Sequence, residues 1–440
     1  MRFICDVGKG AILNLTKIDN FNRKKVLAYV LVGGSGQRLR PLTSNCAKPS
    51  VAFGLDNRIV DFVISNLINS GIIHIYLVAQ YKPDSLLTHV RMRWEEKVER
   101  LNGFVRVICP DDSIPNGQFE GTADAIFKNL DKVNKHQPEL VAIFSADHIY
   151  RMDVRSMVND HLEYNSDVSI SAISVPIARA SSFGVLSVDS GGQVMDFNEK
   201  PSNPVPIPGD PTLAHTSMGN YIFNTNILME VAKEARLRGD LDFGHDIIGW
   251  LIKKYTVHAY NFCNNKIPGV QEFEDSTYWY DVGTIESYWQ SHQDMLGDVP
   301  ILDLDNPLWP IGGLNKSGRK AFDNSFVSFD TQADNAIIRN SIIRGHVMLG
   351  QGVVIEDSII LGDVIIKKGA HIKRAIVDRR NVIAENERIG HNLLTDRQKY
   401  YVDSSGIVVV AAGKLKELSR AKYTDLQNFI VPAMESSYVY

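Results

Sequence analysis

A glycine-rich loop with two cations close behind it holds the residues best suited to chemistry. Gly33, Gly34 and Gly36 follow an apolar run, and Arg38 and Lys48 come shortly after them. Glycines after a strand let backbone N–H groups approach phosphate oxygens, and cations stabilise a leaving pyrophosphate. The loop is not G-x-G-x-x-G, and it lacks the G-K-[ST] ending of a P-loop. The pattern favours a triphosphate site, and the alternative is a tight turn with surface charges.

Two aspartates are candidates for holding a magnesium ion. Asp147 ends an apolar run, and Asp281 precedes a Val-Gly-Thr tripeptide. Proteins usually hold Mg²⁺ with one or two carboxylates together with substrate phosphates. A helix N-cap is the alternative for Asp147, and spacing alone does not show whether the two aspartates meet. His148, His161 and His245 have no ligand spacing, so we take them as residues that bind no metal.

Lys200 is the candidate for binding a sugar phosphate. It follows Glu199 after the segment 194–197, which is a predicted strand with an exposed end. A lysine is a point charge on a flexible stem, which suits a phosphate group. The alternative is a lysine that is only solvated at the surface.

These residues lie at the ends of alternating strands and helices. Apolar, β-branched runs predict strands at 26–32, 72–79 and 140–145, and helical spacing predicts helices at 59–69 and 124–130. The alternation indicates an α/β fold with a parallel sheet that has helices on both faces. Ligands of such sheets bind at the carboxyl ends of the strands, where the glycine loop and the first aspartate would lie.

A second architecture follows near the end of the chain. Aliphatic residues recur there at spacings of five or six: Ile338, Ile343, Leu349, Ile355, Ile360, Ile366, Ile372, Val377, Ile383 and Ile389. Neither a helix nor a plain strand has this period, whereas a solenoid of short parallel strands with triangular coils does. The glycines at 345, 350, 352, 362 and 369 suit its tight corners. The alternative is an irregular β-sandwich.

The length of 440 residues predicts two main domains. We expect a leader at 1–25, a catalytic domain at 26–300, a linker rich in proline and glycine at 301–330, a solenoid at 331–420 and a tail at 421–440.

Composition excludes several other classes of protein. The net charge of −4 provides no overall basic field for nucleic acid, and no apolar run is long enough to span a membrane. Four scattered cysteines form no C-x-x-C pair: Cys5, Cys46, Cys109 and Cys263. This usage fits reduced thiols, and we expect a cytoplasmic protein.

The chain resembles a known family over about residues 26–419. The loop at 33–49 is similar to the signature of sugar-nucleotide pyrophosphorylases, and the segments 121–125, 146–153, 217–221 and 281–284 resemble one branch of them. That branch is the glucose-1-phosphate adenylyltransferases (ADP-glucose pyrophosphorylases) of bacterial glycogen synthesis. The resemblance implies a Rossmann-like nucleotidyltransferase domain followed by a left-handed parallel β-helix, in a homotetramer.

The resemblance also implies roles for individual residues. Arg38 and Lys48 would contact the triphosphate of ATP, and Asp147 and Asp281 would bind Mg²⁺. The nucleotide would lie against Gly33, Gly34, Gly36 and Gly121. Glucose 1-phosphate would be held by Phe119, Gly184, Glu199, Lys200 and Ser217.

Several positions depart from the family pattern. Asn45 and Cys46 stand where bacterial relatives often carry basic residues linked to an activator, Glu120 stands for an arginine, His245 for a lysine and Tyr280 for an arginine. We count these as cations lost around a phosphate-handling site. They predict an active enzyme with altered control by a small-molecule effector. Two alternatives stay open: a pyrophosphorylase for another nucleotide or hexose phosphate, and a catalytically weak regulatory subunit.

Overall fold

The computed structural model describes residues 25–34, 36–110, 117–313, 319–333 and 335–414, so the expected leader and tail lie outside the described residues except for residue 25. The first part of the chain forms a nine-stranded sheet. Seven strands follow the order β10-β9-β11-β6-β1-β4-β5, and β8 and β12 extend it beside β11. The nine strands are β1 (Val26–Val32), β4 (His74–Ala79), β5 (Phe104–Ile108), β6 (Leu140–Ser145), β8 (Val168–Pro176), β9 (Gly184–Val188), β10 (Val194–Glu199), β11 (Leu213–Asn224) and β12 (Val257–Asn261).

The centre of this sheet confirms the predicted parallel arrangement. β6, β1, β4 and β5 run parallel to one another, whereas β11 pairs with β6 in the antiparallel direction. Strand β1 is buried on both sides because its residues alternate between two cores. Val26, Ala28 and Val30 lie in one core, and Leu27 and Tyr29 lie in the other.

Helices supply both of these cores. On one face lie α2 (Val60–Asn69), α3 (Asp84–Val90), α4 (Glu96–Glu99) and α7 (Val154–Glu163). On the other lie α5 (Thr122–Phe127), α6 (Leu130–His136), α9 (Thr225–Arg238) and α10 (Ile248–Leu251). The remaining helices are α8 (Ile177–Ala180), α11 (Ile285–Gln293) and α12 (Leu393–Lys399), with short turns η2 (Gln37–Leu39), η3 (Lys48–Ser50), η4 (Arg91–Glu95), η6 (Phe243–Ile247) and η7 (Phe262–Asn264). The single helix expected at 124–130 is two helices, α5 and α6.

The end of the chain is the predicted left-handed parallel β-helix. All ten aliphatic residues of the repeat are buried in one core. Ile338, Ile355, Ile372 and Ile389 are stacked in register, each 17 residues after the one before. Three short strands therefore make one triangular coil, as the spacing predicts. Glycines occupy only some corners, because Asn340, Asp357 and Arg374 also adopt positive φ angles there.

Three sheets form the sides of the β-helix, and their strands are parallel except for β14 and β27, which pair with β15 and β28 in the antiparallel direction. The first holds β14 (Arg319–Phe322), β15 (Ser325–Ser328), β18 (Ile342–Ile343), β21 (Ile359–Ile360), β24 (Ala375–Val377), β28 (Val408–Val410) and β27 (Tyr401–Val402). The second holds β16 (Gln332–Ala333), β19 (Val347–Leu349), β22 (Val364–Ile366) and β25 (Val382–Ile383). The third holds β17 (Ile337–Arg339), β20 (Val354–Glu356), β23 (His371–Lys373) and β26 (Arg388–Ile389). β14 and β15 fall in the stretch expected to be a linker, and β15 already pairs with β18.

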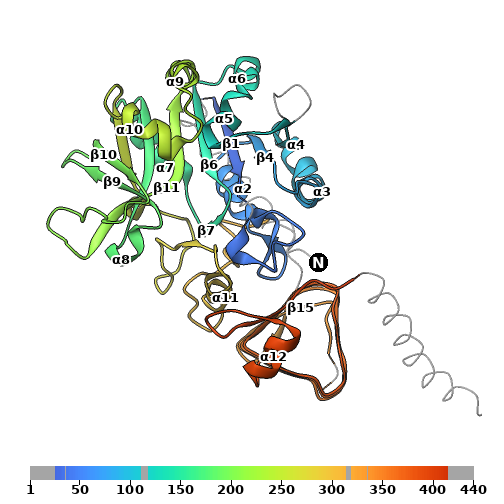
Figure 1. Ribbon diagram of the computed structural model, residues 1–440. Helices are drawn as coiled ribbons and strands as arrows, with labels where there is room; N and C mark the ends of the chain where they lie inside the picture. Colours follow the sequence, from blue (N-terminus) through green and yellow to red (C-terminus); the bar gives the residue numbers. More distant parts are fainter. Residues whose placement is uncertain (1–24, 35, 111–116, 314–318, 334, 415–440) are drawn as a thin grey trace, which may run out of the picture.

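The two architectures share a core. In Figure 1 the β-helix, drawn in orange and red, lies below the sheet domain, with α11 between them. Phe53, Phe62 and Tyr288 from the first part pack in one cluster with Ile342 and Ile359 of the β-helix. Phe53 belongs to a short hairpin of β2 (Ala52–Phe53) and β3 (Asn57–Arg58). Among the described residues, no helix is both long and apolar enough to cross a membrane.

His292 of α11 is buried in this shared core in a fixed tautomer. Its Nε2 accepts a hydrogen bond of 3.1 Å from the backbone N–H of Gly54, so Nδ1 carries the proton and donates to the Tyr288 carbonyl at 2.8 Å. Burial lowers the pKa of His292 to about 3. In the unfolded chain the imidazole has its ordinary pKa of about 6.5 and binds a proton below that pH. In the folded protein it stays neutral there.

We predict that His292 makes the protein less stable as the pH falls below about 6.5, because only the unfolded chain gains the proton. At pH 5.5 the loss is about 1.4 kcal/mol relative to pH 7.5. In His292→Gln, which keeps one acceptor and one donor, the difference between the two pH values is smaller by this amount. Urea unfolding of both proteins at each pH measures it. An equal pH dependence in the two proteins would show that His292 titrates normally in the folded state.

Candidate active site

The two candidate aspartates meet through a small two-stranded sheet. Asp147 lies in the turn between β6 and β7 (His148–Tyr150), so the helix N-cap alternative does not apply. β7 pairs with β13 (Trp279–Asp281) in the antiparallel direction, and the register places Asp281 opposite His148. The pairing brings the carboxylates of Asp147 and Asp281 to one place, which the spacing could not predict.

Lys48 bridges the two carboxylates. Its Nζ lies 2.5 Å from Asp281 Oδ1 and 3.1 Å from Asp147 Oδ2, and the lysine side chain is only 8% exposed. Burial alone lowers the pKa of Lys48, but the carboxylates of Asp147 and Asp281 outweigh burial and raise it. Burial raises the pKa of Asp147, but His148, Lys48 and the Ser145 hydroxyl together hold it well below its usual range. Lys48 and Asp147 thus stay charged at neutral pH.

The carboxylate pair suits a divalent metal ion. Ligand atoms of Asp147, His148 and Asp281 all lie within 4.8 Å of one another. Two carboxylates facing a phosphate site are the donors that a hard cation prefers. The sequence interpretation set His148 aside, yet its Nδ1 lies 3.1 Å from Asp147 Oδ1. The position of His148 directly after Asp147 was the only signal in the sequence for this contact.

The glycine loop and Arg38 lie beside this pair. Gly36 has a φ of +57°, and a Cβ atom there would lie 2.8 Å from the Thr43 side chain, so the turn requires glycine. The Thr43 hydroxyl donates to the Gly36 carbonyl at 2.7 Å. The turn leads into η2, where an Arg38 guanidinium nitrogen lies 3.9 Å from Asp281 Oδ2 while the side chain is 72% exposed. Arg38 is therefore free to turn toward a ligand.

A cleft lies beside the glycine loop. It has a volume of about 370 Å³ and is lined by Gly33, Gly34, Gln80, Phe119 and Gly121, among others. A Cβ atom at Gly121 would lie 2.3 Å from the Leu241 carbonyl oxygen, so this close approach requires glycine. Phe119, which the resemblance assigned to the sugar phosphate, lines this cleft together with Gly33, Gly34 and Gly121, which were assigned to the nucleotide.

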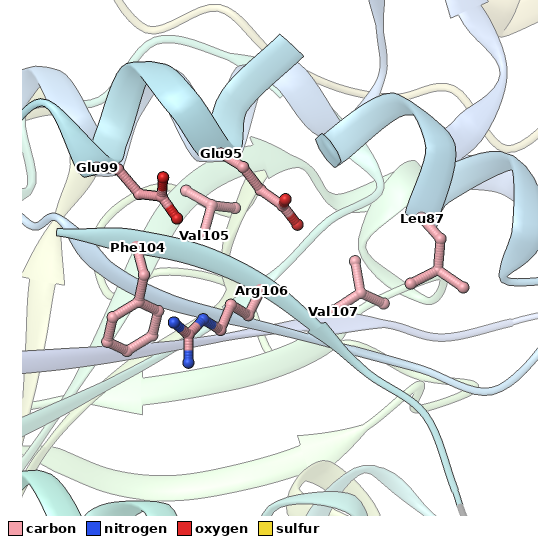
Figure 2. A pocket seen from close by; sticks show the side chains of 7 residues that line it. All are labelled: Leu87, Glu95, Glu99, Phe104, Val105, Arg106 and Val107. Carbon is pink, nitrogen blue, oxygen red and sulfur yellow. The ribbon is translucent and has the colours of Figure 1, made fainter. Parts of the chain in front are cut away.

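A second hollow of about 370 Å³ lies along the edge strand β5 (Figure 2). It is lined by Leu87, Glu95 and Glu99 and by β5 residues 104–107. None of the residues expected to bind a substrate lines it, so the cleft beside the glycine loop is the better candidate.

The residues expected at the sugar phosphate gather around the start of β9. Gly184 pairs with Glu199, and a Cβ atom at Gly184 would lie 2.5 Å from the Phe197 ring. Lys200 Nζ lies 2.7 Å from Glu199 Oε1 and its side chain is 64% exposed. Ser217 lies on β11, where the preceding Thr216 pairs with Val185 of β9. Four of the five expected residues, all except Phe119, thus lie in one region.

Aromatic rings connect this region to the carboxylate pair. Phe183, next to Gly184, has its ring centroid 5.1 Å from that of Trp279. Trp279 stacks in turn on His148, with 4.6 Å between the centroids. The sequence analysis assigned no role to Phe183 or Trp279. The available signal was that Phe183 directly precedes Gly184 and that Trp279 lies two residues before Asp281.

The departures from the family pattern do not all face the site. On β13 the side chains alternate, so Tyr280 points away from Asp281 and packs on the core shared with the β-helix. Arg179 lies 5.7 Å from the Tyr280 ring. The replacement of the family's arginine by Tyr280 therefore removes no cation from the face of β13 that carries Asp281, contrary to the sequence interpretation. His245 is exposed and lies 2.5 Å from the Asp246 carboxylate.

Comparison with known proteins agrees with this geometry. Residues 27–297 match the family described as "Nucleotidyl transferase", and residues 314–410 match "GlmU-like, C-terminal hexapeptide". Glucose-1-phosphate adenylyltransferase of Thermodesulfovibrio yellowstonii is 45% identical over 393 residues, which cover 88% of this chain and 96% of that protein. The chain belongs to the glucose-1-phosphate adenylyltransferase family.

Other members of the adenylyltransferase family match over a similar length. The protein of that name from Geobacter metallireducens is 41% identical over 401 residues, covering 88% of this chain and 97% of its own. The one from Corynebacterium glutamicum is 36% identical over 411 residues, covering 89% and 98%. The family match therefore spans both the sheet domain and the β-helix.

Replacing Lys48 tests the bridge between the carboxylates. We predict that Lys48→Met increases the affinity of the nucleotide-free protein for Mn²⁺ by about tenfold, because the ammonium no longer neutralises Asp147 and Asp281. Titration of Mn²⁺ followed by electron paramagnetic resonance measures the affinity. Lys399→Met, which removes a lysine 3.1 Å from Glu387 in the β-helix part, is the control and leaves the affinity unchanged. A weaker or unchanged Mn²⁺ affinity in Lys48→Met would contradict the bridge.

Proposed function

We propose that the protein transfers the adenylyl group of ATP to α-D-glucose 1-phosphate. The products are ADP-glucose and pyrophosphate, and ADP-glucose serves the synthesis of glycogen. The observation that carries the proposal is the cluster of Lys48, Asp147 and Asp281 beside the glycine loop. Family membership over most of the chain supports the choice of ATP and glucose 1-phosphate, because the relatives are named for this reaction.

The nucleotide would lie in the cleft beside the glycine loop. Gly33, Gly34 and Gly36 would receive the triphosphate, and Gly121 would lie near the base. The volume of about 370 Å³ is in the range of small-molecule sites. Phe119 lines the same cleft, so we assign it to the nucleotide side of the site.

Glucose 1-phosphate would lie near the start of β9. Lys200 would bind the phosphate, and Glu199 and Ser217 would bind sugar hydroxyls. Gly184 would let the sugar approach the backbone. The sugar phosphate would lie near the ring of Trp279, which stacks on His148 and so lies close to Asp147.

The reaction is an in-line substitution at the α-phosphorus of ATP. A phosphate oxygen of glucose 1-phosphate forms a new P–O bond there, and the bond to the bridging oxygen of pyrophosphate breaks with its electron pair. The attacking phosphate is already ionised near neutral pH, so no general base is required. The site must hold the two substrates in line and stabilise the charge on the departing pyrophosphate. Lys48 and Arg38 lie where their charges can do so.

Asp147 and Asp281 would hold Mg²⁺. The bound ion would supply positive charge against the phosphate oxygens and fix their orientation. Lys48, which bridges the same carboxylates in the protein alone, would then be released to bind the phosphates.

Four further proposals accompany this function. The protein acts as a homotetramer in the cytoplasm. It has a catalytic domain at 26–300 and a β-helix domain whose first parallel strand, β15, begins before residue 331. Control by a small-molecule effector is altered, because Asn45 and Cys46 replace basic residues. Cys46 is buried at a cavity of about 170 Å³ between the two parts of the chain. Strong activation by fructose 1,6-bisphosphate that depends on residues 45 and 46 would contradict this last proposal.

Pyrophosphate release tests the function directly. With Mg²⁺ and glucose 1-phosphate, we expect turnover with ATP and little with UTP, GTP, CTP or dTTP. Asp147→Ala lowers kcat by about 10²–10³-fold or more, because the carboxylate that organises the phosphates is lost. Asp131→Ala, which changes an exposed aspartate bound to Lys132, is the control and keeps full activity. Preference for another nucleotide would indicate a pyrophosphorylase with a different nucleotide specificity. No turnover with any of the five nucleotides would indicate a regulatory subunit.

Lys200 tests the placement of the sugar phosphate. We predict that Lys200→Gln raises the KM for glucose 1-phosphate by about 10–100-fold, the expected loss for a hydrogen bond to a charged group, and leaves the KM for ATP within about twofold. Steady-state kinetics with each substrate varied in turn measure both constants. Lys254→Gln, which changes an exposed lysine bound to Glu234, serves as the control. An equal increase in both constants would place Lys200 outside the sugar-phosphate site.

A further inference from the structure

One arginine of the β-helix binds the hairpin that follows Lys48. Arg344 stands directly after β18 and is partly buried between the two parts of the chain. Its Nη1 donates to three backbone carbonyl oxygens: Phe53 at 3.0 Å, Gly54 at 2.7 Å and Asn57 at 3.1 Å. A single guanidinium therefore holds both strands and the turn of the β2–β3 hairpin.

The same hairpin is joined closely to Lys48. Lys48 begins η3, and the backbone N–H of Val51 donates to the Lys48 carbonyl at 3.0 Å. β2 starts at the next residue. The N–H of Ile59, after the hairpin, donates back to the Val51 carbonyl at 3.1 Å. Movement of the hairpin would therefore move the backbone that carries the lysine.

Helix α11 connects the hairpin to the opposite side of the site. The Tyr288 hydroxyl donates to the Ala52 carbonyl at 2.6 Å, and the Gly54 N–H donates to His292 at 3.1 Å. α11 is capped by Thr284, three residues after Asp281. The hairpin thus has Lys48 on one side and is bonded to the helix that follows Asp281.

The contact depends on polar bonds rather than on close packing alone. A cavity of about 170 Å³ lies against the hairpin, lined by Val51, Ala52, Arg58 and Arg344 among others. Packing does not fill this side of the hairpin, so the three bonds of Arg344 restrain it here, in addition to the packing of Phe53 in the shared core. Burial lowers the pKa of Arg344 to about 10, so its guanidinium remains charged at neutral pH.

We propose that Arg344 is a positioning residue for the reaction: it fixes the hairpin against α11, and so holds Lys48 in register with Asp147 and Asp281. The β-helix thereby takes part in building the catalytic site. This role rests on the proposed function for its effect on turnover, but its effect on Lys48 does not depend on that function.

The test compares Arg344→Met and Arg344→Lys with the wild type. Methionine keeps much of the length and loses all donors, whereas the lysine ammonium can donate to the same carbonyls. Arg339→Met is the matched control, because Arg339 is an exposed β-helix arginine bound to Asp323 and Glu356 and does not touch the hairpin. If Arg344→Met does not fold, Arg344→Gln replaces it in the same measurements.

The first measurement is steady-state turnover. We expect Arg344→Met to lower kcat about 10–100-fold with the KM for each substrate within about threefold, since small displacements of catalytic groups cost this much. Arg344→Lys recovers kcat to within about threefold of the wild type, and Arg339→Met keeps it. A normal kcat in Arg344→Met would overturn the proposal, as would the same loss in Arg339→Met.

The second measurement needs no activity. If Arg344 holds Lys48 between the carboxylates, Arg344→Met increases the affinity of the nucleotide-free protein for Mn²⁺ by at least about threefold, and Arg344→Lys restores the wild-type value. Deuterium exchange of the amides of residues 51–59 is faster in the same variant. An inactive wild type would refute the proposed function while this measurement still decides the role of Arg344. Faster exchange with unchanged Mn²⁺ affinity would show a structural role only and overturn the proposal.

Discussion

The placement of one ammonium group between two carboxylates is the constraint on which the site depends. Lys48 Nζ lies 2.5 Å from Asp281 and 3.1 Å from Asp147 although Lys48 and Asp281 are 233 residues apart. Two carboxylates this close repel each other unless a cation lies between them. The lysine serves as that cation in the protein alone, and a metal ion would replace it when the phosphates bind. On this proposal the site would exchange one positive charge for another.

Three separate parts of the structure bring these groups together. The strand β6 carries Asp147 to its carboxyl end, and the β7–β13 pair brings Asp281 beside it. The hairpin after Lys48 is held by α11 and by Arg344 of the β-helix. The sheet domain and the β-helix therefore both hold the hairpin that follows Lys48.

Much of the frame could be predicted because its signals are local. The strands at 26–32 and 140–145 were predicted at their observed bounds, and the ten aliphatic residues of the β-helix follow from a period that inward-facing positions impose. The meeting of Asp147 with Asp281 was implied only by the family resemblance and could not be predicted from spacing, because it depends on a pairing between strands far apart in sequence. β15 was missed because one four-residue strand before the repeat carries no period. Tyr280 was misread because its orientation is fixed by alternation along β13.

The most direct test of the account is a crystal structure of the protein with Mn²⁺ and a non-hydrolysable ATP analogue. Anomalous scattering locates the Mn²⁺ ion independently of the surrounding atoms. The account predicts the ion in contact with carboxylate oxygens of both Asp147 and Asp281, with Lys48 turned from them toward the triphosphate in the cleft beside the glycine loop. An ion bound elsewhere, or Lys48 still bridging the two carboxylates with nucleotide and metal present, would contradict it.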